Sequence, residues 1–164
     1  MPYKSISMST TLTSPFPVRM VGPADLDAHL RLVYDEPFLD EKTREYSAGY
    51  LGRFGGERII GMFNETGEFL LAEMTLIKTQ EHDGINCWDF RRNQHIPETQ
   101  CFEEAFCAGV NVMIKSAERL GVGRTVVDLR VPNPDGLAVQ AFSKAGFKNL
   151  RYKDLDQKFT MTKG

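Results

Sequence analysis

One segment, from Gln100 to Val131, limits the choice of fold more than any other part of the sequence. It reads QCFEEAFCAGVNVMIKSAERLGVGRTVVDLRV, and its apolar residues recur every three or four positions at Phe106, Val110, Met113 and Ala117. That spacing predicts a long amphipathic helix, which LGVG would end. The β-branched TVVDLRV that follows predicts a buried strand. A helix that returns to a strand in this way indicates a crossover beside a parallel neighbour.

The flanking segments complete a mixed α/β (α+β) pattern. Before the long helix we expect a strand, two helices and an antiparallel meander at residues 17–21, 22–37, 41–54, 58–64, 68–79 and 85–92. After it we expect the 125–131 strand, a helix from 135 to 146, and an antiparallel pair at 147–152 and 158–162. The predicted order is β-α-α-β-β-β-α-β-α-β-β. Residues 1–16 are expected to form a flexible Ser/Thr-rich leader and 17–164 a single domain.

Charge argues against two classes of partner. The chain has 20 basic and 22 acidic residues, a net charge of −2, so nothing electrostatic favours nucleic acid or a membrane surface. The densest basic pair, Arg91-Arg92, is too short to form a patch. No apolar run reaches the roughly 18–20 residues that span a bilayer. We therefore expect no nucleic-acid partner and no membrane partner.

Cysteine and histidine spacing bears on compartment and metal binding. Cys87, Cys101 and Cys107 are odd in number and lack CxxC spacing, which favours reduced thiols in the cytoplasm. The histidines, at positions 29, 82 and 95, have no metal-ligand spacing. We expect no metal site. As structural residues Cys87 and Cys107 are small hydrophobes. Cys101 lies near a helix N-terminus, which favours the thiolate.

The helix after the buried strand carries the pattern A…F.KAGF, at Ala138, Phe142, Lys144, Gly146 and Phe147. With the element order and AERLGVGRTVVDLRV, the chain resembles the GCN5-related N-acetyltransferase (GNAT) superfamily from about residue 17 to its end. The resemblance implies an acyl-CoA N-acyltransferase-like fold and acetyl-CoA (acyl-CoA) as co-substrate. It also implies transfer of the acyl group to an amine of a small molecule or peptide.

The resemblance places the coenzyme at the start of the long helix. The family's pyrophosphate loop, Q/R-x-x-G-x-G/A, falls on Gln100–Ala105, with Glu103 in place of a glycine. Such a loop directs backbone N–H groups and the helix dipole at phosphate oxygens. Glu103 and Glu104 either occupy that anion site themselves or simply complement the helix N-terminus. The candidate coenzyme contacts are Phe90, Arg92, Gln100, Cys101, Phe102, Glu103, Glu104, Ala105, Asn133 and Phe142.

Two of these candidates depart from the family pattern. Phe142 stands where the family usually has a tyrosine that protonates the departing thiolate or orients the thioester. A phenylalanine packs similarly but has no proton to give. Phe142 therefore indicates a slower enzyme, a substitute acid such as water, or no chemistry. The alternative is that Phe142 is simply a core aromatic. Asn133 lies two residues before the register of the family's asparagine, which Asp135 occupies, and VPNPDG also forms a turn in its own right.

Acyl transfer to an amine needs a base, and two strand acids are candidates. Glu73 lies in FLLAEMTLI and Asp89 in CWDFRR. If the two acids face inward, burial would raise their pKa and suit them to proton transfer. If they face outward, they are ordinary solvent-side residues. Glu98 and His95, in the loop before the long helix, are weaker candidates.

These observations support two functions. The first is an N-acyltransferase acting on an amine acceptor. The alternative is a catalytically weakened or inactive protein of the same fold that binds a partner, because fold alone does not license function. The resemblance implies that the acceptor binds at residues 25–54 and 78–84. The acids of 35–45 either receive a cationic amine or form a solvated face. Tyr46, Tyr50 and Leu51 indicate packing against a surface that the sequence does not identify, and a homodimer is one candidate.

Overall fold

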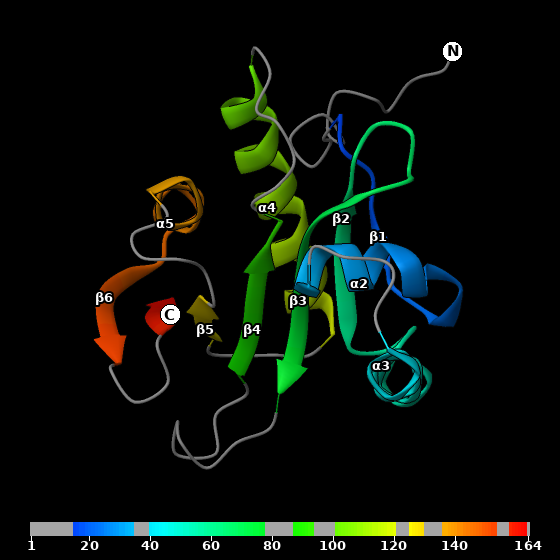
Figure 1. The fold of residues 1–164 in the computed structure, drawn as a ribbon. Helices are drawn as coiled ribbons and strands as arrows, with labels where there is room; N and C mark the ends of the chain where they lie inside the picture. Colours follow the sequence, from blue (N-terminus) through cyan, green and yellow to red (C-terminus); the bar gives the residue numbers. More distant parts are fainter. Residues whose placement is uncertain are drawn as a thin grey trace.

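Strands and helices follow one another in the predicted order (Figure 1). The computed structural model describes residues 15–34, 40–77, 87–93, 101–120, 125–129, 136–153 and 158–163. Within these ranges the strands are β1 (Val18–Met20), β2 (Ile59–Phe63), β3 (Leu70–Ile77), β4 (Cys87–Arg92), β5 (Thr125–Leu129), β6 (Lys148–Lys153) and β7 (Lys158–Lys163). The helices are the short 3-10 helix η2 (Pro23–Asp25), α2 (Leu26–Tyr34), α3 (Glu41–Phe54), α4 (Phe102–Arg119) and α5 (Gly136–Lys144).

The strands form one sheet in the order β1-β2-β3-β4-β5-β7-β6. β4 and β5 are parallel, as the crossover through α4 predicts, and their register runs from Cys87 opposite Val126 to Phe90 opposite Leu129. The other neighbouring strands are antiparallel. The last strand, β7, lies between β5 and β6. The predicted parallel pair and closing antiparallel pair are therefore both confirmed.

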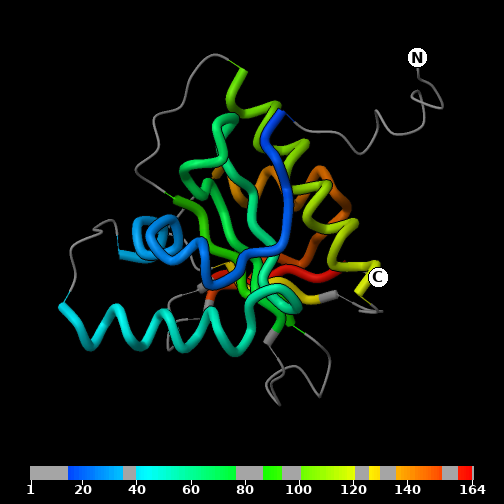
Figure 2. Tube along the Cα trace, turned by 90° about the vertical axis from the view of Figure 1, so that its right-hand side faces the viewer, coloured from blue at the N-terminus to red at the C-terminus, as the bar shows by residue number. Residues whose placement is uncertain are grey.

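Helices cover the sheet on both sides, as the turned view shows (Figure 2). α4 and α5 pack on one face through a large apolar cluster that includes Trp88, Phe90 and Phe142. α2 and α3 cover the β2–β4 half of the other face through a smaller cluster that includes Leu51 and Phe63. Because side chains alternate along a strand, the even-numbered residues of β4 face α4 and α5, and the odd-numbered ones face α2 and α3.

Single residues explain where α3 begins and how closely α4 packs on the sheet. The Asp40 carboxylate accepts a hydrogen bond from the Thr43 N–H at 2.8 Å, which caps the first turn of α3. In α4 a Cβ at Gly109 would meet the Met62 sulfur, so a glycine lets α4 lie close to β2. The four residues that predicted α4, from Phe106 to Ala117, are all buried.

The helix expected at 22–37 is described as η2 and α2 as far as Tyr34, and residues 35–39 lie outside the described part of the chain. One boundary differs from the sequence expectation. Phe16, assigned to the leader, is buried, and its ring centroid lies 5.6 Å from that of Phe102. Packing of the folded domain therefore begins by Phe16. Among the helices described, none is both long and apolar enough to cross a bilayer.

Candidate functional site

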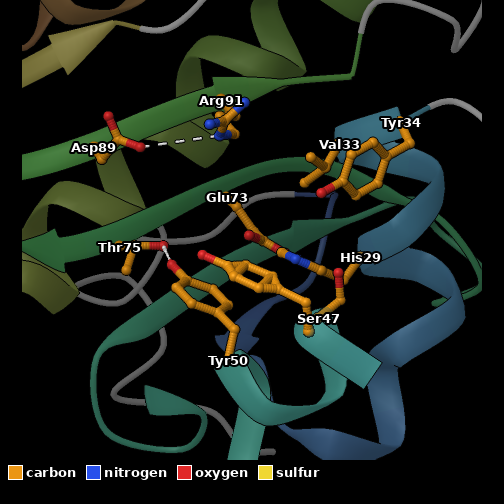
Figure 3. Close-up of a pocket in the computed structure, with 10 residues that line it drawn as sticks. His29, Val33, Tyr34, Ser47, Tyr50, Glu73, Thr75, Asp89 and Arg91 are labelled. Carbon is orange, nitrogen blue, oxygen red and sulfur yellow. Dashed lines mark hydrogen bonds and ion pairs between the residues drawn. The ribbon is translucent and has the colours of Figure 1, made fainter. Parts of the chain in front are cut away.

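A pocket of about 290 Å³ lies between the sheet and the two helices that cover its β2–β4 half (Figure 3). α2 and α3 form one wall, and β3 and β4 form the floor. The lining residues are His29, Val33, Tyr34, Tyr46, Ser47, Tyr50, Glu73, Thr75, Asp89 and Arg91. The volume is at the lower end of the range for small-molecule sites. Tyrosines and ionisable groups dominate the lining, so the pocket suits a small polar ligand.

Glu73 of β3 and His29 of α2 form a buried pair in this pocket. His29 Nδ1 lies 2.6 Å from Glu73 Oε2, and the side chains are only 7% and 3% exposed. One proton must lie between these two atoms, carried either by the imidazole or by the carboxyl group. The sequence left the orientation of Glu73 open, and the structure shows that it faces inward.

Tyr50 of α3 packs beside this pair. Its ring stacks on His29 with the centroids 5.7 Å apart, and its hydroxyl donates to Thr75 Oγ1 at 3.0 Å. Burial, reinforced by the negative charges of Glu73 and Asp89, raises the pKa of Tyr50 to about 12. The phenol therefore stays protonated throughout the neutral range and acts as a hydrogen-bond donor.

Asp89 and Arg91 form the β4 side of the pocket. Asp89 is 9% exposed, so it too faces inward rather than toward solvent. Arg91 Nε lies 3.9 Å from Asp89 Oδ2, which is an ion pair but too long for a hydrogen bond. The register places Thr75 beside Asp89 and Glu73 beside Arg91. The floor thus presents two carboxylates and one guanidinium to a ligand.

Within the described residues the parallel β4–β5 ladder extends as far as Phe90, near the end of β4, and Arg91 and Arg92 pair with β3. α4 starts at this end of the sheet because it returns antiparallel to β4 and β5. Cys101, before its first turn, has a left-handed φ of 63°. Phe102 is buried, whereas Glu103 and Glu104 are exposed in the first helical turn and Ala105 is half-buried.

Two other candidate coenzyme residues, Phe90 and Phe142, belong to the core. Phe142 is fully buried, and its ring meets Phe90 edge-on at 4.9 Å and Phe147 at 5.2 Å. The reading of Phe142 as a core aromatic therefore holds. The guanidinium of Arg92 lies 5.5 Å from the Phe106 ring centroid, near the first turns of α4.

The arrangement of these elements is shared with known structures. A GCN5-related N-acetyltransferase from Kribbella flavida matches at 16% identity, over 91% of this chain and 97% of that one, with a TM-score of 0.59. The chain has the fold of the GCN5-related N-acetyltransferases. Within this GNAT fold, a ribosomal-protein-S5-alanine acetyltransferase from Vibrio fischeri matches at 10% identity, over 92% of each chain, with a TM-score of 0.57. An acetyltransferase of the GNAT family from Streptococcus pneumoniae matches at 15% identity, over 91% and 99%, with a TM-score of 0.57. No protein-family model matches the sequence, and no curated protein matches it either.

The GNAT-fold pocket contains residues that sequence reasoning did not select. His29 has no metal-ligand spacing in the sequence, yet it falls three residues after Leu26, next to the apolar stripe of α2. That position was the available signal for its burial. Ser47, Tyr50, Thr75 and Arg91 gave no comparable signal because their roles depend on how α3 packs. Gln100, Asn133, His95 and Glu98 lie outside the residues that the structure describes.

Proposed function

We propose that this protein is an acyl-CoA-dependent N-acetyltransferase whose amine acceptor binds in the pocket between α2, α3, β3 and β4. The observation that carries the proposal is the pocket's position. It places buried Glu73 and Asp89 beside the parallel pair β4 and β5, with Asp89 in that ladder opposite Asp128. The GNAT fold of acetyltransferase structures supports the reaction class. Acetyl-CoA as the donor is inferred from that class.

Residues at the start of α4 fit an anionic coenzyme. The first N–H groups of a helix lack intrahelical acceptors, and they carry the positive end of its dipole. Arg92 adds a guanidinium at the same end of the sheet. Glu103 and Glu104 oppose an anion, but both are exposed and have room to turn toward solvent. The backbone of Phe102–Glu104 and the side chain of Arg92 would hold the phosphates.

The pocket residues handle the protons of the transfer. An acceptor reaches the pocket mainly as an ammonium ion and must lose a proton before its nitrogen lone pair can attack the thioester carbonyl. Asp89, or the Glu73–His29 pair, takes that proton. The C–N bond then forms, the C–S bond breaks with its electron pair going to sulfur, and the second amine proton leaves to the same groups. Phe142 gives the sulfur no proton, so water supplies it; a thiol ionises near pH 8.5, which makes the thiolate a tolerable leaving group.

A partner-binding protein that has lost this chemistry is the alternative. Phe142, buried in the core without a phenol, and Glu103 at the helix N-terminus are the observations that favour it. The two functions differ in one measurable property, which is turnover of acetyl-CoA in the presence of an amine.

Thermal denaturation with and without acetyl-CoA is the first test. At about 100 times its dissociation constant a specific ligand stabilises the fold by roughly 2.7 kcal/mol, so the Tm should rise by a few degrees. Absence of any shift at millimolar acetyl-CoA would overturn the proposal. Binding without thiol release across a broad amine panel would favour the partner-binding alternative.

Variants of the two carboxylates then test the chemistry by thiol release. We expect Asp89→Asn or Glu73→Gln to lower kcat by about 10²–10⁴-fold, the usual contribution of a general base, with the acetyl-CoA-induced Tm shift retained. Asp27→Asn is the matched control, because Asp27 is an exposed α2 carboxylate paired with Arg44. If all three variants turn over like the wild type, the pocket is not where the amine reacts.

A further inference from the structure

Arg91 does not form the ion pair with Glu73 that its position in the sheet predicts, because Glu73 contacts His29 instead. The β3–β4 register places it directly opposite Glu73 on the same face of the sheet. Opposite charges at such positions commonly interact. Here Glu73 instead contacts His29 Nδ1 at 2.6 Å, and no ion pair joins it to Arg91. His29 of α2 thus binds the Glu73 carboxyl group, and Arg91 is left without that partner.

The terminal nitrogens of Arg91 are available to a ligand. Its one ion pair with the described part of the chain is through Nε, at 3.9 Å from Asp89, and the two Nη groups donate no hydrogen bond to those residues. The side chain is 42% exposed and lines the pocket. A guanidinium presents parallel N–H groups that match the two oxygens of a carboxylate. The free edge of Arg91 is therefore a ready site for a carboxylate.

The carboxyl groups of Glu73 and Asp89 lie beside the Arg91 guanidinium, so the pocket has a negative side and a positive side. Glu73 and Asp89 are both buried on the pocket floor, one opposite Arg91 and the other two residues before it on β4. Directly opposed side chains begin about 4.5–5.5 Å apart at their Cβ atoms. One small molecule can therefore reach both sides, and a pocket of about 290 Å³ admits only a small one.

We propose that the acceptor is a zwitterionic amino carboxylic acid, held by its carboxylate on Arg91 with its amine directed to Asp89 and Glu73. This inference rests on the proposed function and specifies its substrate class. A simple alkylamine would leave the Nη groups of Arg91 without an anionic partner. An amine bearing a phosphate would bring a double negative charge toward two carboxylates, so a singly charged carboxylate fits the pocket better.

Matched acceptor pairs that differ only in the carboxylate test this inference. Alanine and ethylamine, leucine and isopentylamine, and phenylalanine and phenethylamine are assayed by thiol release with acetyl-CoA. We expect kcat/KM to favour the amino acid of the preferred pair by about tenfold or more. Arg91→Gln should raise KM for that amino acid by about 10- to 100-fold and leave the amine within about threefold. Arg91→Lys, which keeps the charge but not the planar fork, should fall between.

Arg119→Gln is the matched control, since it removes the same charge from the exposed end of α4, on the far face of the sheet. It should behave as the wild type. Equal use of both members of every pair, or an equal loss for both in Arg91→Gln, would overturn the inference and leave N-acetyl transfer intact.

Calorimetric titration of the protein alone with the same amino acids gives a reading independent of turnover. Binding lost in Arg91→Gln supports the inference, and no binding to the wild type contradicts it, whereas failure to bind acetyl-CoA counts against the proposed function.

Discussion

Nδ1 of His29 lies 2.6 Å from Oε2 of Glu73, although 44 residues separate them in the chain. The contact joins α2 to the middle of the sheet and forms the inner wall of the pocket. Both side chains are almost completely buried. Stability and the shape of the candidate acceptor site therefore depend on the same pair.

Breaking this pair should destabilise the protein strongly. We expect His29→Leu to lower the free energy of unfolding by about 3–5 kcal/mol, because it leaves the Glu73 carboxylate buried without its partner. The double variant His29→Leu/Glu73→Met should recover part of the loss. Urea denaturation measures both, and Asp27→Asn, which breaks an exposed pair, should cost less than about 1 kcal/mol. Strictly additive single losses would show that the two residues are not coupled.

Tyr50 should titrate later than an ordinary tyrosine. Its pKa is raised to about 12 by burial first and by nearby Glu73 and Asp89, against about 10 in the unfolded chain. The neutral phenol therefore stabilises the fold fully below pH 10, and this contribution is lost as the pH rises from about 10 to about 12. The difference in phenolate absorbance between wild type and Tyr50→Phe isolates this group. A difference curve centred near pH 10 would contradict the burial of its hydroxyl.

Two helical glycines should respond to alanine with opposite signs. Gly109→Ala drives a Cβ into the side chain of fully buried Met62, and overpacking typically costs about 1–3 kcal/mol. Gly49→Ala, on α3, meets nothing within 4 Å and should gain about 0.5–1 kcal/mol from helix propensity. Urea midpoints give both values. A stabilised Gly109→Ala would mean that α4 and β2 are less closely packed than described.

Phe142→Tyr should lower stability without raising turnover. Its ring is completely buried and packed edge-on against Phe90 and Phe147, so a hydroxyl without a partner costs about 1–3 kcal/mol. Phe63→Tyr, equally buried on the other face, is the control for that cost. Faster thiol release in Phe142→Tyr alone, largest below the pKa of the thiol, would show that the new phenol does reach the leaving sulfur.

Removing the charge of Glu103 should tighten coenzyme A binding. The residue lies in the first turn of α4, where a carboxylate competes with a phosphate for the positive end of the helix dipole. An effect of about 0.3–1 kcal/mol corresponds to roughly two- to fivefold in Kd for Glu103→Gln. Glu57→Gln, an exposed acid just beyond α3, should leave Kd unchanged. Weaker binding in Glu103→Gln would place the phosphates elsewhere.

The element order could be predicted from sequence because it depends on local patterns. The apolar spacing of α4 and the β-branched run of β5 each act over a few residues and predicted elements that the structure confirms. The position of β7 between β5 and β6 required the structure, since pairing of the closing strands does not say which one joins β5.

The pocket could be predicted only in part. Glu73 is flanked by apolar residues that face the other side of the sheet, and Asp89 lies between Trp88 and Phe90. Strands buried on both faces show no alternation between apolar and polar residues, so the orientation of these acids was not readable from the sequence. The His29 contact depends on how α2 sits on β3, which no local pattern encodes.

Side chains of β4 alternate between the hydrophobic core and the pocket, so two different requirements act on one strand. Trp88 and Phe90 maintain the interior that the fold requires, whereas Asp89 and Arg91 line the pocket. We expect point substitutions at the odd-numbered positions, together with changes on α2 and α3, to alter which small molecule the pocket admits while the hydrophobic interior stays as it is. A directed library confined to positions 73, 75, 89 and 91 would therefore sample new specificities on an unchanged scaffold.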